Sequence, residues 1–129
     1  MGQKYLIDSN VLIDYTALRL PKSGSDFVEH LFDTDFFISV VVKIEVLGYE
    51  TVPHKMIDME EFVSTATVFP LDNAVTQKTI ELRRVHKRLK LGDAIIAATA
   101  LIHNFTLISR NLSDFKNIIG LSVIDPHQF

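Results

Sequence analysis

Short apolar runs rich in branched and aromatic side chains recur along the chain and alternate with longer segments of helical periodicity. Such runs are typical of buried strands, which we expect at residues 5–7, 36–40, 67–69, 106–108 and 122–124. Helices are predicted at residues 10–15, 25–32, 41–49, 56–65, 72–89 and 93–104, with the clearest loop at residues 21–25. Because helices between strands form parallel crossovers, the pattern predicts an α/β sandwich.

The predicted helix at residues 93–104 is apolar nearly all round, which is typical of a helix buried in a core. The whole chain has 129 residues, of which 47% are hydrophobic, so we expect a single domain over residues 1–129. The absence of cysteine excludes disulfides and thiolate metal sites. With no apolar run long enough for a membrane span or a signal peptide, the sequence indicates a soluble, cytoplasmic protein.

Four acidic residues occupy positions that converge on one edge of the predicted sheet. Asp8 directly follows the first strand, and Glu45 lies about one turn into the helix after the second. Asp93 opens the buried helix, and Asp114 lies in the loop that follows the fourth strand. In an open parallel sheet, functional groups gather beyond the carboxyl ends of the strands. The four carboxylates can therefore form one site.

Each of these acids also has an ordinary structural explanation. Asp8 or Asp93 could cap a helix N-terminus, Asp114 could cap a turn, and Glu45 could face solvent. Their joint pattern favours a functional site, because a carboxylate among apolar neighbours is costly unless it is paired or binds a metal. Crowded carboxylates raise one another's pKa, and a divalent cation relieves that repulsion. An all-oxygen site suits Mg²⁺ or Mn²⁺.

Other common chemistries lack their motifs in this sequence. The five histidines show no His-x-x-x-His spacing, and we interpret them as structural or surface residues. The chain has no Gly-x-Ser-x-Gly elbow, no Walker loop and no Gly-x-Gly-x-x-Gly fingerprint.

Four segments in order resemble the PIN-domain ribonucleases, and in particular the VapC-like toxins of type II toxin–antitoxin pairs. They are Leu6-Ile7-Asp8-Ser9-Asn10, Ile38-Ser39-Val40 followed by Glu45-Val46-Leu47-Gly48-Tyr49, Gly92-Asp93-Ala94-Ile95-Ile96-Ala97-Ala98-Thr99-Ala100, and Ser109-Arg110-Asn111-Leu112-Ser113-Asp114-Phe115. The resemblance covers nearly the whole chain. It implies a three-layer α/β/α fold with a parallel sheet of about five strands.

The resemblance also implies roles for individual residues. Asp8, Glu45 and Asp93 would hold a first Mg²⁺ or Mn²⁺ ion, and Asp114 would complete the site or help to hold a second. Ser109 and Asn111 match polar positions of the family motif that support the acidic cluster, and Asn10 would orient Asp8. Ser109 stands where threonine is common in the family, which keeps the hydroxyl. The implied reaction is hydrolysis of RNA to products with a 5′ phosphate and a free 3′ hydroxyl.

The chain carries a net charge of −3, yet five of its 13 basic residues fall within residues 83–90. A solvated helix face is the ordinary interpretation. If the chain is a ribonuclease, the stretch could instead bind RNA phosphates beside Asp93, with Arg84, Lys87 and Arg88 on one helical face.

The family resemblance also implies a protein antitoxin as partner and a homodimer. Two alternatives remain open: a receiver-like phosphoacceptor domain, which shares the size and an acidic pocket, and a PIN fold that only binds a partner. Receiver chemistry needs paired acids after the first strand, whereas Asp8 stands alone there. Metal-dependent cleavage of RNA separates the nuclease from both alternatives.

Overall fold

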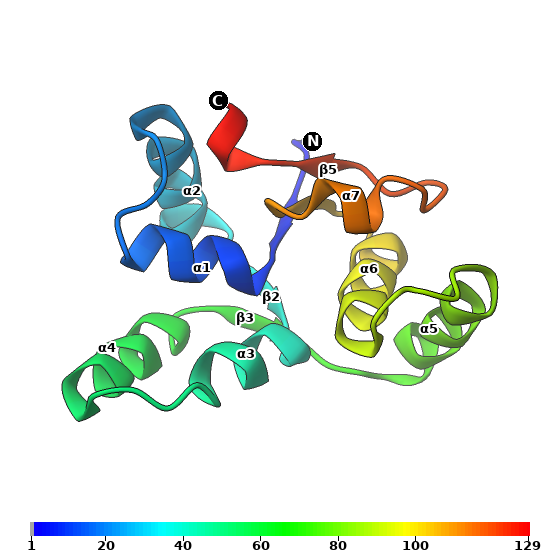
Figure 1. The fold of residues 1–129 in the computed structure, drawn as a ribbon, viewed down its shortest axis with the longest axis horizontal. Coiled ribbons are helices and arrows are strands. Elements are labelled where there is room, and N and C mark those ends of the chain that lie inside the picture. Colours follow the sequence, from blue (N-terminus) through cyan, green and yellow to red (C-terminus); the bar gives the residue numbers. More distant parts are fainter. Residues whose placement is uncertain (1) are drawn as a thin grey trace.

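Five parallel strands form the centre of the computed structural model, which describes residues 2–129 (Figure 1). One ladder has the order β1 (Tyr5–Ile7), β4 (Thr106–Ile108) and β5 (Val123–Ile124). A second ladder pairs β2 (Phe37–Ser39) with β3 (Thr67–Phe69). Because β2 packs beside β1, the strands follow the order β3, β2, β1, β4, β5. The predicted α/β fold with a parallel sheet is confirmed, although the hydrogen-bonded ladders have three and two strands.

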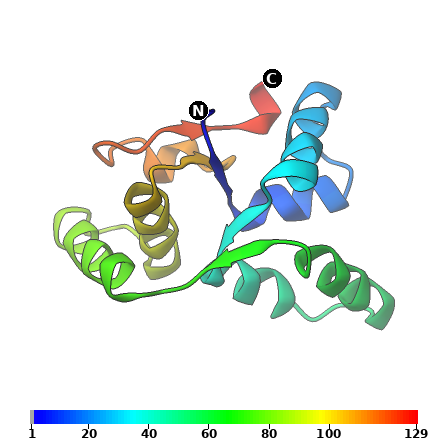
Figure 2. The same ribbon diagram turned by 180° about the vertical axis from the view of Figure 1, so that it is seen from behind.

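Helices cover the strands on two sides, so that the molecule has three layers. The pair α1 (Ser9–Thr16) and α2 (Lys22–Thr34) lies across the strands from the pair α5 (Asn73–Val85) and α6 (Leu91–His103) (Figures 1 and 2). The remaining helices are α3 (Val40–Leu47), α4 (Pro53–Val63), the short α7 (Leu112–Phe115) and the 3-10 helix η1 (Pro126–Gln128). Among the described residues, no helix is long and apolar enough to cross a membrane.

Helix α6 is buried over most of its length, as its uniformly apolar sequence predicts. Every residue from 94 to 100 is buried, and the helix packs against α5. It ends at Asn104, which adopts the left-handed conformation with φ 58° and donates its backbone N–H to carbonyls of the last turn. This burial fixes the position of Asp93 in the first turn of α6.

The predicted helix at residues 72–89 is too long by one turn. Helix α5 ends at Val85, and His86 leaves the helical conformation with φ −106° and ψ 86°. This turn allows Leu89 to enter the core, where it is buried. Consequently Lys87 and Arg88 lie outside the helix, and the prediction that they share one helical face with Arg84 is wrong.

The predicted loop at residues 21–25 is also wrong, because α2 already begins at Lys22. Pro21 precedes the helix in an extended conformation, so its fixed φ does not interrupt the helix. Gly24 lies in the first turn against η1, where a Cβ atom would overlap the backbone carbonyl of Pro126. The glycine is therefore a packing residue and not a sign of a loop.

Candidate active site

Asp8 is the most rigidly held acid of the site. It follows β1 and caps the N-terminus of α1, where Oδ1 accepts a hydrogen bond from the Ser9 backbone N–H at 2.8 Å. Its Oδ2 accepts from the Ser109 hydroxyl at 2.8 Å and from Asn10 Nδ2 at 3.1 Å. The side chain is almost fully buried. The ordinary explanation for Asp8, a helix cap, is thus confirmed, and the cap places the acid at the carboxyl end of the sheet.

The register between β1 and β4 brings the supporting residues next to Asp8. Ile7 pairs with Ile108, so the residues that follow them meet at the same edge. Asn10 Nδ2 also donates to Ser109 Oγ at 3.2 Å, while Asn10 Oδ1 accepts from the Arg110 backbone N–H at 3.2 Å. The backbone N–H of Asn111 donates to Ser109 Oγ at 3.1 Å. Of the residues predicted as supports, Asn10 and Ser109 thus contact Asp8 directly, whereas Asn111 contacts Ser109.

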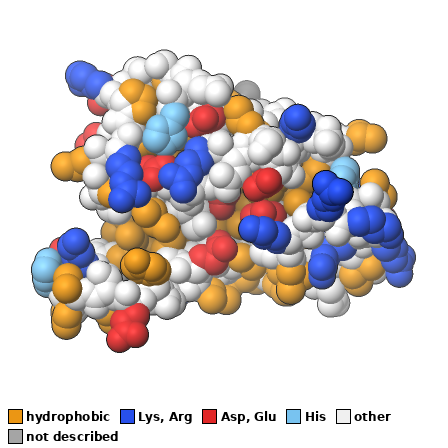
Figure 3. All heavy atoms as spheres, in the orientation of Figure 1, with side chains coloured by type: hydrophobic (Ala, Val, Ile, Leu, Met, Phe, Trp, Pro, Cys, Tyr) orange, Lys and Arg blue, Asp and Glu red, His pale blue; other side chains and the backbone are white. Residues whose placement is uncertain are grey.

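A cavity of about 260 Å³ collects all four predicted carboxylates. Its walls come from α1 and its N-cap, from α3, from the start of α6 and from the segment after β4. They include Asp8, Glu45, Asp93, Asp114, Asn10, Asn111, Lys90 and Arg110. On the face that Figure 3 shows, acidic side chains gather near the middle between groups of lysine and arginine on either side. Positions far apart in the sequence thus share one acidic pocket with a basic rim.

The charges of these carboxylates influence one another. Burial, together with Asp8, Asp114 and Glu45, raises the pKa of Asp93 to about 6, against a smaller opposing effect of Lys90. Burial also raises the pKa of Asp8, although the hydrogen bonds from Ser109, Ser9 and Asn10 oppose this shift.

Glu45 and Asp114 lie at the more open part of the cavity, where both side chains are exposed. Partial desolvation and the charge of Asp8 nevertheless raise the pKa of Glu45, with a hydrogen bond from Ser9 acting in the opposite direction. The ordinary explanation for Glu45 as a solvent-facing residue is correct for its exposure, but the residue also lines the acidic cavity.

Asp93 does not cap its helix. Lys90 occupies the N-cap of α6, and Asp93 lies at the third helical position, with its carboxylate in the cavity wall. A carboxylate in the first turn interacts favourably with the helix dipole, but the raised pKa indicates that repulsion and burial outweigh that gain. Capping therefore does not explain this acid.

The donor atoms fit a hard divalent cation, because the cavity offers carboxylate oxygens and neither histidine nor cysteine. In residues 2–129, however, no three acidic or histidine side chains are grouped tightly enough to hold a metal ion in this conformation. Two of the four acids are exposed side chains on the rim, Glu45 and Asp114.

Sequence reasoning missed a fifth acid near the site, Asp14, which is fully buried in α1. Its carboxylate binds Arg110 Nη1 at 2.9 and 3.0 Å and lies 2.8 Å from His127 Nε2. The guanidinium of Arg19 is 3.9 Å away. The available signal was an aspartate within the apolar run of residues 11–15, at a position where only a paired charge is tolerated.

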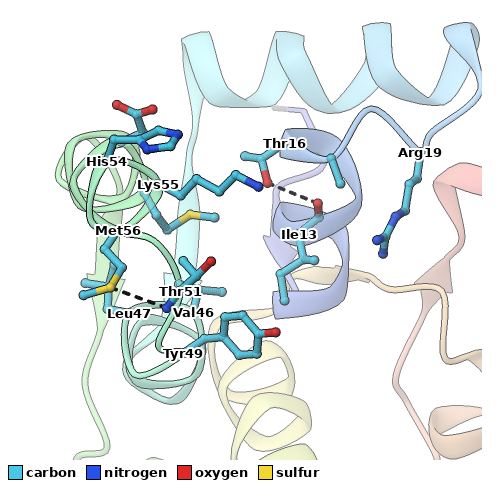
Figure 4. A pocket seen from close by; sticks show the side chains of 13 residues that line it. Ile13, Thr16, Arg19, Val46, Leu47, Tyr49, Thr51, His54, Lys55 and Met56 are labelled. Atoms are coloured by element: carbon cyan, nitrogen blue, oxygen red, sulfur yellow. Dashed lines mark hydrogen bonds between the residues drawn. The ribbon is translucent and has the colours of Figure 1, made fainter.

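A second, larger cavity of about 710 Å³ lies between α1, α3 and α4 (Figure 4). Its lining is mixed, with the apolar side chains of Ile13, Val46 and Met56 and the basic side chain of Lys55. Ile13 lines both cavities, so this larger cavity, called the groove below, opens beside the acidic cavity.

Comparison with known proteins gives consistent matches over nearly the whole chain. The family model of the PIN domain matches residues 5–120. Ribonuclease VapC1 from Rickettsia felis is 31% identical over 130 residues, which cover 92% of this chain and 93% of that protein.

Solved structures give the same picture. A toxin–antitoxin complex from Klebsiella pneumoniae contains a chain with a TM-score of 0.78 and 30% identity, over 95% of this chain and 98% of that one. VapBC2 from Rickettsia felis, bound to a DNA fragment from its promoter, matches with a TM-score of 0.80 and 21% identity over 95% of this chain and 98% of that chain.

Proposed function

The chain belongs to the PIN-domain family, and from that premise we propose that it is a metal-dependent endoribonuclease that acts as the toxin of a type II toxin–antitoxin pair. The observation that carries the proposal is the single cavity lined by Asp8, Glu45, Asp93 and Asp114. The similarity to Ribonuclease VapC1 supports RNA as the substrate class. A receiver-like phosphoacceptor has no support from these matches.

The residues of the cavity have distinct roles in this proposal. Asp8 would be the fixed ligand for Mg²⁺ or Mn²⁺, since its hydrogen bonds hold both carboxylate oxygens in place. Asp93 and Glu45 would share that ion, and Asp114 would complete the site or help to hold a second ion. A bound divalent cation supplies Lewis-acid activation of water and charge stabilisation at phosphorus. Asn10 and Ser109 orient Asp8, and Asn111 supports Ser109 through its backbone.

Basic side chains on the approach to the cavity would bind the RNA backbone. Arg84 lies in the last turn of α5, whereas Lys87 and Arg88 lie in the turn that leads to Lys90 on the cavity wall. All three side chains are exposed. Phosphates on either side of the bond that is cleaved could therefore contact them from two different elements.

Cleavage of an end-labelled RNA by the purified protein tests the proposed activity. We expect cleavage with Mg²⁺ or Mn²⁺, none with a chelator, and products that carry a 5′ phosphate. Asp93→Asn prepared in parallel excludes a contaminating nuclease, because it should be inactive. Intact RNA after incubation of the wild type with either metal would favour the alternative of a PIN fold that only binds a partner.

A protein antitoxin would occupy the groove of Figure 4 and extend a basic side chain into the acidic cavity. The solved neighbours from Klebsiella pneumoniae and Rickettsia felis are toxin–antitoxin complexes. Ile13 joins the two cavities, so one short segment can reach from the groove to the carboxylates. Arginine is suited to this role, because it pairs bidentately with carboxylates.

Co-expression with the product of the neighbouring reading frame tests this partner. Tyr49 lines the groove and is exposed, so Tyr49→Glu should weaken capture of the antitoxin while RNA cleavage persists. Equal capture by the wild type and the variant, or a complex whose acidic cavity stays open to solvent, would contradict this mode of inhibition.

A further inference from the structure

The ion pair between Asp14 and Arg110 lies next to the acidic cavity. Arg110 lines the cavity, whereas the carboxylate of Asp14 is not part of it. Asp14 is completely buried, and a buried carboxylate is strongly unfavourable unless it is paired. Its partners are the nearby Arg19, just after α1, and two residues from distant parts of the chain, Arg110 after β4 and His127 in η1. The cluster thus joins the C-terminal segment to the edge of the sheet that carries the cavity.

Arg110 is fixed at both its backbone and its side chain. Its backbone N–H donates to Asn10 Oδ1, and Asn10 in turn donates to Asp8. Its Nη1 donates to both carboxylate oxygens of Asp14. The guanidinium therefore has a defined position relative to Asp8, with little side-chain entropy left to lose on binding.

A large part of the guanidinium remains available to a ligand. The side chain is 48% exposed and lines the acidic cavity. Within residues 2–129, Nε and Nη2 have no protein acceptor, so the N–H groups that do not face Asp14 point to no other partner. A planar edge of unused N–H groups matches the oxygen atoms of a phosphate.

Binding of RNA at the acidic cavity requires a cation close to the carboxylates. Four carboxylates repel a polyanion, and Lys90 and Arg110 are the basic residues on the cavity wall. A fixed cation next to the carboxylates can hold one phosphate of the strand while its neighbour enters the cavity. Such a contact needs a cation in a fixed position, whereas the exposed side chains of Lys87 and Arg88 in the α5–α6 turn have no ion pair within the described part of the chain that would fix them.

We propose that Arg110 is a substrate-binding residue that contacts an RNA phosphate adjacent to the scissile one, and that Asp14 and His127 are positioning residues that hold its guanidinium at the cavity. This inference rests on the proposed ribonuclease function. It adds a specific contact to that function and a reason for the burial of Asp14.

Steady-state cleavage of a fluorescent single-stranded oligoribonucleotide over a range of salt concentrations tests the contact. Arg110→Gln should raise KM about tenfold, as expected for loss of a charged hydrogen bond, with a smaller effect on kcat. The slope of log KM against log salt should fall by about 0.7, the value for one phosphate of a single strand. Lys4→Gln, which removes an equal charge from an exposed side chain at the end of β1 opposite to Asp8, should change neither quantity.

Asp14→Asn separates positioning from simple electrostatics. The variant gains one unit of positive charge, so electrostatics alone would tighten RNA binding, whereas loss of the fixed guanidinium should weaken it.

Because a change at a buried residue can impair folding, Arg110→Lys serves as a second variant. It keeps the charge on an exposed side chain but cannot reach Asp14 and a phosphate together, so its KM should lie between those of the wild type and Arg110→Gln.

Two results distinguish failure of this inference from failure of the proposed function. An unchanged KM and salt slope in Arg110→Gln, with active wild type and inactive Asp93→Asn, would overturn the role of Arg110 alone. If the wild type does not cleave, fluorescence anisotropy of the same oligoribonucleotide still tests Arg110. Equal affinities of wild type and Arg110→Gln in that measurement would overturn the inference, and a weaker affinity of the variant would support it.

Discussion

The carboxylate of Asp93 lies among three others of the same charge and is only half-buried, so its ionisation depends strongly on its neighbours. We expect Asp93→Asn to abolish RNA cleavage, since the change removes one charged ligand from the proposed metal site. A residue that merely caps a helix would tolerate the change, because asparagine caps about as well as aspartate. The measurement is RNA cleavage with Mg²⁺ and Mn²⁺. Full activity of the variant would remove Asp93 from the active site.

The raised pKa of Asp93 also predicts a pH dependence of stability. The folded state holds the proton up to pH of about 6, whereas the unfolded chain releases it near the ordinary value of 3.8. The contribution of Asp93 to the free energy of unfolding is therefore fully present below pH 3.8, and it is lost as the pH rises through about 6. We expect a loss of about 1 kcal/mol, less than the full shift would give, because Asp93 is partly exposed.

Urea unfolding of the metal-free protein from pH 4 to pH 7.5 measures this effect. Asp93→Asn should lack that part of the pH dependence and should be no less stable than the wild type at neutral pH. Parallel pH profiles for the two proteins would show that burial and neighbouring charges do not raise the pKa of Asp93.

At the scale of single residues, the sequence located the acids of the cavity and their supports better than the buried ion pair of Asp14. Asp8 and Ser109 could be located because each directly follows a strand, and parallel register then forces them together. The partners of Asp14 could not be located, because Arg110 and His127 are 96 and 113 residues away and nothing local marks them. Contacts between distant segments depend on the tertiary fold, which local patterns do not contain.

At the scale of elements, strands were predicted more accurately than helix ends. Residues 5–7, 67–69 and 106–108 match β1, β3 and β4, since short runs of branched and aromatic side chains favour strands. The errors occur where packing decides: α5 stops so that Leu89 can enter the core, and α2 starts early so that Gly24 can meet η1. Helix α7 is a single turn and has no periodicity to detect.

Gly24 provides a prediction about the contact between α2 and η1. Alanine normally stabilises a helix interior relative to glycine by up to about 1 kcal/mol. Here the added Cβ atom would overlap the Pro126 carbonyl, so Gly24→Ala should instead destabilise the protein by about 1 to 3 kcal/mol. Thermal or urea unfolding measures the change. Gly2→Ala, with nothing near its Cβ position, is the control and should be neutral. Stabilisation by Gly24→Ala would mean that η1 moves easily away from α2.

The turn between α5 and α6 gives a second prediction at this scale. Combined replacement of Arg84, Lys87 and Arg88 by alanine should weaken RNA binding and flatten its salt dependence, because phosphate contacts release counterions. Fluorescence anisotropy with the oligoribonucleotide at several salt concentrations measures both quantities. An unchanged salt slope would assign the basic stretch to an ordinary solvated surface.

At the scale of the whole molecule, the site exists only in the folded chain. Asp8 follows β1, Glu45 lies in α3, Asp93 in α6 and Asp114 in α7, so four separate elements supply the cavity. The parallel arrangement explains this convergence, because the carboxyl ends of β1 and β4 lie at the same edge. An unfolded chain cannot present the same set of oxygen atoms, and a cation should therefore bind the native state selectively.

Selective binding predicts a stabilisation that depends on metal concentration. At a hundredfold excess over the dissociation constant, Mg²⁺ or Mn²⁺ should stabilise the wild type by about 2.7 kcal/mol relative to the protein in chelator. The gain should shrink in Glu45→Gln and in Asp93→Asn, since each removes a negative charge from the cavity. Glu61→Gln, which neutralises an exposed acid on α4 outside the cavity, should retain the full gain. Thermal melts of the four proteins across a metal titration measure these shifts. Equal shifts in all of them would place the cation on the general acidic surface of the molecule, and the cavity would then lose its role as the metal site.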